Sequence, residues 1–164
     1  MKTLIILLTV CATAASVLAQ QVNLMIQPIN SKRGSGGDYS RDVQASRALK
    51  ITIQNPTPNH INGLTLRWAV VKSKVGTTID PYQKHAFGAE QQIDLKPLEQ
   101  LVIETKTVSV ARREYDYTNH KYGEVIDGHG AQVLKDGKII AEQMTPPAIK
   151  KSFENIRPVE GDKK

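Results

Sequence analysis

The chain has 164 residues, a formal net charge of +6 and one cysteine, Cys11. This length suits a single domain, since domains typically contain about 100–150 residues. No stretch after Ala19 is apolar enough to cross a membrane, which takes about 20 residues, so an integral membrane protein is not expected.

The first segment has the pattern of a secretory signal peptide. Lys2 supplies a positive charge, an apolar run follows from Leu4 to Val10, and the small residue Ala19 precedes the expected cut. Cleavage would leave a mature chain that begins at Gln20. The sequence therefore predicts an exported protein, periplasmic or extracellular.

The cysteine lies inside this segment, so the mature protein has no thiol and packing alone must hold its fold. The alternative, in which Cys11 carries a lipid anchor, is disfavoured because Val10 stands where a small residue is expected. Positive and negative side chains are interspersed along the chain, which favours a solubilising role. A positive excess also attracts anionic surfaces, but no nucleic-acid partner is expected for an exported chain.

Alternating or β-rich apolar segments predict a series of short strands along the chain. Polar or turn-forming segments separate them, and those at 31–42 and 72–84 are predicted to be loops. The predicted strands cover 22–27, 49–54, 64–71, 86–95, 98–110 and 124–135, with a last one from Lys138 that ends before the prolines at 146 and 147.

Two local features carry more detail. The inward face of the long run at 98–110 switches from Leu101 and Ile103 to Val108 and Val110, which predicts a bulge or bend between them. Asp136-Gly137 between apolar flanks predicts a hairpin with a type I′ turn, because that turn needs positive φ at both central residues.

The segment after the two prolines, 148–156, is predicted to form a short helix with Ile149 and Phe153 on one side. Residues 157–164 are expected to be a disordered tail, which leaves 20–156 as the folded domain. The predicted core comprises Leu49, Ile51, Ile53, Leu64, Leu66, Trp68, Val70, Leu101 and Ile103. The strand pattern predicts an all-β sandwich.

A lone Trp68 on the strand after Leu49-Lys50-Ile51-Thr52-Ile53 resembles the core tryptophan of immunoglobulin-like and fibronectin-III-like domains. The closing hairpin at 128–142 is similar to the last two strands of such domains. The resemblance covers residues 49–143 and lacks the disulfide of antibody domains. It implies an antiparallel immunoglobulin-like β-sandwich of about seven strands, and it fixes no function because many proteins share this architecture.

No pattern of residues predicts catalysis or a metal site. His120 and His129 lie near Asp116, Glu124 and Asp127 in the sequence, but their spacing matches no zinc motif. There is no nucleophile with a base and an orienting group. We therefore expect neither an enzyme nor a metal or cofactor.

The candidate site is a polar, aromatic segment, 112–122. Exposed tyrosines beside basic groups suit stacking on sugars, binding of acidic glycans or a protein contact. The alternative is that the tyrosines pack on neighbouring strands, one of them as a tyrosine corner, while the basic residues guard an edge strand. The expected ligand-binding residues are Arg112, Arg113, Tyr115, Tyr117, His120 and Tyr122.

The main hypothesis is an exported, non-catalytic β-sandwich that binds or supports a protein or polysaccharide partner of the envelope or extracellular space. Two alternatives stay open at this point. One is a small secreted hydrolase or metal-dependent enzyme on a sandwich scaffold. The other is a structural subunit of a surface or periplasmic assembly.

Overall fold

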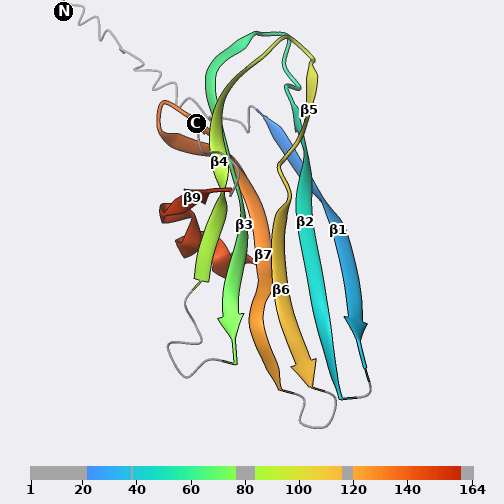
Figure 1. Ribbon diagram of the computed structural model, residues 1–164. Coiled ribbons are helices and arrows are strands. Elements are labelled where there is room, and N and C mark those ends of the chain that lie inside the picture. Colours follow the sequence, from blue (N-terminus) through green and yellow to red (C-terminus); the bar gives the residue numbers. More distant parts are fainter. Residues whose placement is uncertain (1–21, 38, 77–83, 116–119, 160–164) are drawn as a thin grey trace, which may run out of the picture.

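The computed structural model of the chain describes residues 22–37, 39–76, 84–115 and 120–159. Within them the protein is almost entirely β-structure, which confirms the predicted all-β class (Figure 1). The elements in chain order are β1 (Asn23–Gly36), β2 (Ser40–Gln54), β3 (Ile61–Val75), β4 (Lys84–Leu95), β5 (Gln100–Glu104), β6 (Val108–Tyr115), β7 (Lys121–Lys135), β8 (Lys138–Thr145), the 3₁₀ helix η1 (Pro147–Glu154) and β9 (Ile156–Pro158). Among the described residues, no helix is long and apolar enough to span a bilayer.

The described strands are hydrogen-bonded into one sheet in the order β1-β2-β6-β7-β3-β4-β9, with β5 beside β2 and β8 beside β7. The pairings are antiparallel except for β9, which runs parallel to β4. The observed single sheet differs from the predicted sandwich, in which about seven strands would form two separate antiparallel sheets. The two halves are continuous because β6 pairs with β2 on one side and, over Arg112–Glu114, with β7 on the other.

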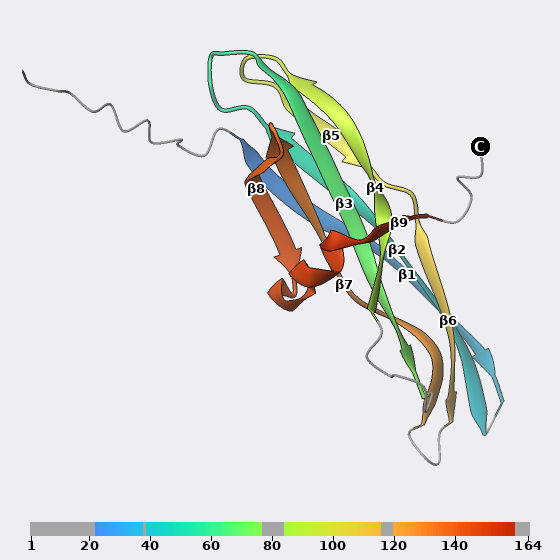
Figure 2. The ribbon, with the colours of Figure 1, turned by 90° about the vertical axis from the view of Figure 1, so that its left-hand side faces the viewer.

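At one end of the molecule the sheet forms two layers. Figure 2 shows β1, β2 and β5 behind β3, β7 and β8 in that region. Hydrogen bonds between the layers include one from the Ile26 amide to Gln143 Oε1 at 2.9 Å and one between Arg47 and the His129 ring at 3.1 Å. At the other end β1, β2, β6, β7, β3 and the start of β4 form a single layer, which we call the arm (residues 27–36, 40–46, 72–76, 84–85, 109–115 and 121–127).

The main core lies between the two layers and contains Trp68, which is 4% exposed. The predicted core is largely confirmed, because its members on β2 and β3 are all buried. Leu101 and Ile103, on the edge strand β5, are only half-buried and pack against the cluster. The strands that contain Leu49 and Trp68, β2 and β3, do not pair with each other. The chain crosses from one layer to the other between them.

Both local turn and bulge predictions are confirmed. Ile51 pairs with Ile103 and Arg47 pairs with Val108, so the chain from β5 to β6 holds one more residue than β2 opposite it. Asp136 and Gly137 have φ of 50° and 74°, as a type I′ turn requires.

The predicted loop at 31–42 was wrong. β1 and β2 pair continuously from Asn23 with Gln54 to Gly36 with Arg41, so this segment is mostly a long hairpin. Backbone hydrogen bonds between β1 and β2 stabilise this hairpin. Apolar and polar side chains do not alternate along it, because this end of β1 covers no core. In the same way β3 continues to Val75 through a segment predicted to be a loop.

The C-terminal segment packs on the outer face of β3, β4 and β7. Ile149 and Phe153 of η1, as predicted, are buried there in a second small cluster with Ala69, Val71 and Ala86. Gly128 and Gly130 of β7 make room for these two side chains. A Cβ on Gly128 would lie 3.0 Å from Ile149, and one on Gly130 would lie 3.1 Å from Phe153.

The chain remains ordered beyond the predicted end of the domain. Arg157 and Pro158 form part of β9, and Val159 is buried in the main core. The disordered tail expected from Arg157 therefore does not begin there, because β9 gains backbone hydrogen bonds from β4. Residues 160–164 lie outside the described residues.

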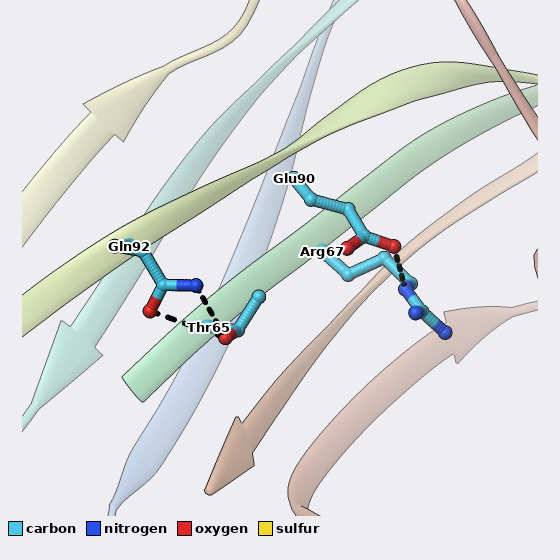
Figure 3. A network of polar contacts seen from close by, with 4 residues as sticks. All are labelled: Thr65, Arg67, Glu90 and Gln92. Atoms are coloured by element: carbon cyan, nitrogen blue, oxygen red, sulfur yellow. Dashed lines mark hydrogen bonds and ion pairs between the residues drawn. The ribbon is translucent and has the colours of Figure 1, made fainter. Parts of the chain in front are cut away.

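The rest of this outer face carries polar side chains that are exposed or half-buried. Figure 3 shows two cross-strand pairs between β3 and β4: Gln92 Nε2 donates to Thr65 Oγ1 at 3.0 Å, and Arg67 Nε lies 2.5 Å from Glu90 Oε1. These polar groups bond to each other, which makes this face a solvated surface with paired charges.

Candidate functional site

The described residues of the segment expected to be a binding loop lie mostly in strands. Arg112, Arg113 and Tyr115 lie at the end of β6, and Tyr122 lies at the start of β7, just after His120. The two strands pair here, which a polar, aromatic sequence did not indicate. Tyr117 lies outside the described residues.

The described aromatic residues do come together at the tip of the arm. The rings of Tyr115 and Tyr122 meet edge to face with centroids 5.9 Å apart, and the His120 ring lies 6.3 Å from that of Tyr122. The Tyr115 amide donates to the His120 carbonyl at 3.0 Å, which holds the two strands in register. Tyr115 is 37% exposed and Tyr122 47%, so both rings remain open to a ligand.

The two arginines of the predicted site point to opposite faces of the arm and are already paired. Arg113 binds Asp42 through two hydrogen bonds of 2.7 and 3.1 Å, which lowers the pKa of that carboxyl. Arg112 donates to Glu114 at 2.7 Å and lowers the pKa of Glu114 in turn. Neither guanidinium is a free cation.

The face of the arm that carries Tyr122 is polar across its full width; we call it the front face. Register places residues directly opposite one another in rows across the strands. Nearest the tip is the row Ser35, Asp42, Arg113 and Tyr122. The second row is Arg33, Gln44, Ala111, Glu124 and Lys74, and the third begins with Ser31, Ser46 and Ser109. Ala111 and Glu124 lie one residue beyond the last hydrogen-bonded pair of β6 and β7, Arg112 with Gly123.

The second and third rows surround a hollow of about 650 Å³. Small residues line it on β6 and β2, above all Ala111, Ser109 and Ser46, and longer side chains such as Arg33 and Gln44 stand beside them. The difference in side-chain length leaves the space, since a regular sheet is otherwise flat. This volume lies within the range of about 300–1,000 Å³ that is usual for ligand-binding pockets.

One side of the hollow is an ordered ion pair. Lys72 Nζ lies 3.0 Å from Glu124 Oε2 and 4.4 Å from the centroid of the Phe87 ring. The Lys72 side chain is only 13% exposed. These contacts fix its ammonium group in one place, so the hollow offers ligands a preorganised pair of charges.

The residues that line the hollow were missed by sequence reasoning. They come from β1, β2, β3, β6 and β7, which only the sheet pairing brings together. Ser109 had no distinctive sequence context. The polar alternation on the long hairpin, Ser31, Arg33 and Ser35 opposite Ser46, Gln44 and Asp42, was the signal that could have indicated a polar sheet face.

The described residues that were considered as metal ligands contact other side chains of the protein. Glu124 pairs with Lys72 and Asp127 with Lys84, while His129 is buried next to Arg47. Asp116 lies outside the described residues. Within the part of the chain that the structure describes, no three histidine, cysteine or acidic side chains converge as metal ligands would.

No family model and no curated protein matches this chain. Two solved structures are similar to it. A crystal structure from Akkermansia muciniphila has 14% identity and a TM-score of 0.36, with 85% of this chain and 80% of that chain covered. The Northeast Structural Genomics Consortium target SoR45 has 10% identity and a TM-score of 0.35, with 76% and 86% covered. Likeness at this level carries no conclusion about function.

Proposed function

We propose that this chain is an exported, non-catalytic binding module that holds a polysaccharide on the front face of its arm. The observation that carries the proposal is the polar hollow of about 650 Å³ together with the exposed rings of Tyr115 and Tyr122 on the same strands. Export rests on the signal-peptide pattern of residues 1–19, which lie outside the described part.

The chemistry of the front face favours a sugar over an apolar ligand. Serine hydroxyls and the Gln44 amide can both donate and accept hydrogen bonds, as sugar hydroxyls do. A tyrosine ring offers an apolar face on which a sugar ring can stack. Each net hydrogen bond contributes about 0.5–1.5 kcal/mol, so affinity requires several such contacts along a chain of sugars.

The finer architecture is part of the same proposal. Two layers around a core that contains Trp68 support an immunoglobulin-like architecture for the two-layered end, although the strands form one mixed sheet. In this arrangement the two-layered end supplies stability and the single-layered arm supplies the binding surface. The scaffold would then resemble other sandwiches that carry a site at one end.

The proposal is tested by filling the hollow. Ser109→Trp places an indole in the hollow at an exposed strand position, where a large side chain costs little stability. We expect the mature protein to bind at least one member of a panel of immobilised envelope and plant polysaccharides, and Ser109→Trp to lose that binding with an unchanged melting temperature.

The matched control is Val102→Trp, an exposed position on β5 away from the hollow, which should bind as the unaltered protein does. Binding to no polysaccharide of the panel, or full binding by Ser109→Trp, would contradict the proposed function.

A further inference from the structure

The arm holds more positive charge than its own carboxylates neutralise. Each acidic residue of the arm is engaged by one basic residue, since Asp42 pairs with Arg113, Glu114 with Arg112, Glu124 with Lys72 and Asp127 with Lys84. Arg47 is held by Asn30 and His129. The remaining cations form no ion pair with a described residue and are exposed; they are Lys32, Arg33, Arg41, Lys74 and Lys121.

Two of these free cations stand in one row of the front face. Arg33 is on β1 and Lys74 is on β3, opposite Gln44 and Glu124 respectively. Four strand spacings separate them, or about 19 Å at about 4.8 Å for each spacing. The hollow, with Gln44, Ala111 and Glu124, lies between them.

The separation of about 19 Å between the two backbone positions favours a long ligand over a single compact anion. It suits an extended chain with repeated negative groups that crosses the arm from β1 to β3. The chain would place hydroxyls against the serines of the hollow and an acidic group near each of Arg33 and Lys74. Both cations have long side chains that form no ion pair with a described residue and can adjust to the spacing of these groups.

We infer that the polysaccharide held by the front face is acidic, with carboxylate or sulfate groups, and that Arg33 and Lys74 select it. This inference rests on the proposed function and adds the charge of the ligand. Exposed ion pairs are individually weak and are screened by salt. The selection should therefore be strong at low salt and weak at high salt, as for other proteins that bind polyanions.

The test uses glycans that differ only in charge: carboxymethyl dextran with dextran, and polygalacturonate with its methyl ester. The protein variants are the double substitution Arg33→Gln with Lys74→Gln, and a control of equal charge, Lys96→Gln with Lys138→Gln, at exposed positions away from the arm. We expect the unaltered protein to prefer the acidic member of a pair. The Arg33/Lys74 variant should bind it about tenfold more weakly at low salt, with a smaller salt dependence.

The control variant should bind as the unaltered protein does, which separates the two named cations from overall charge. Equal binding of the neutral and acidic members, or undiminished binding by the Arg33/Lys74 variant, would overturn the inference and leave the polysaccharide function standing. Binding to vesicles of anionic lipid with none to either type of glycan would overturn both, in favour of a membrane surface.

Discussion

At the scale of single residues, Asn55 shows how one buried polar side chain organises a crossing between layers. It follows β2 and is fully buried. Its Nδ2 donates to the carbonyls of Asn59 and Lys96 at 2.7 and 2.9 Å, and its Oδ1 accepts from the amide and hydroxyl of Thr57. The proline-rich turn thus folds around one amide, whose hydrogen-bonding capacity is completely used.

We predict that Asn55→Ala lowers the free energy of unfolding by about 3 kcal/mol, because it removes the four hydrogen bonds of this buried amide to Thr57, Asn59 and Lys96, each of which contributes about 0.5–1.5 kcal/mol. Chemical denaturation of the mature protein measures the change. Asn62→Ala, at an exposed position in the next strand, should stay within about 0.5 kcal/mol of the unaltered protein. A similar small change for both variants would show that the turn does not depend on Asn55.

At the scale of elements, η1 fastens the C-terminal segment to the outer face of the sheet. Its buried residues Ile149 and Phe153 are at i and i+4, and the glycines of β7 let them approach the backbone. A 3₁₀ helix of eight residues has little stability of its own. Packing against β3 and β4 therefore determines that it forms.

We predict that Phe153→Ala lowers the free energy of unfolding by about 3–5 kcal/mol, the usual cost of removing a buried aromatic side chain. The matched truncation Ile29→Ala, on an exposed position of β1, should cost far less. Urea titrations of both variants give the comparison. Equal effects would show that η1 adds nothing to the fold.

At the scale of the whole molecule, the hydrogen bond between Arg47 and His129 joins the two layers where they meet the arm. Burial lowers the pKa of His129, and the positive charge of Arg47 lowers it further. The folded protein therefore binds a proton at this ring more weakly than the unfolded chain does. Proton uptake favours unfolding, so stability should fall as the pH drops below about 6.5.

We predict that the melting temperature decreases between pH 7.5 and 5.5, and that His129→Gln removes most of this decrease. One proton limits the slope to about 1.4 kcal/mol for each pH unit. His85→Gln is the control, because the pKa of this more exposed ring is also lowered, by burial first and then by Arg157. A pH dependence that survives in His129→Gln and disappears in His85→Gln would show that His85, and not His129, controls it.

Local patterns in the sequence determined the structural features that depend only on residues near one another in the chain. The alternation around Leu49 and Trp68 gave core strands, the face switch near Ile103 gave the bulge, and Asp136-Gly137 gave the turn. Each of these follows from side-chain periodicity or from the backbone angles that a residue allows. The apolar spacing of Ile149 and Phe153 likewise indicated the short helix.

Only the tertiary structure decided the rest. The polar half of β1 and the end of β6 are strands because they pair with β2 and β7, and backbone pairing leaves no apolar alternation in the sequence. The hollow joins side chains that are up to 93 positions apart, from Ser31 to Glu124, and register alone aligns them. Which cations form no ion pair within the described part of the chain is also a tertiary property, because it depends on the basic residue that lies next to each carboxylate in space.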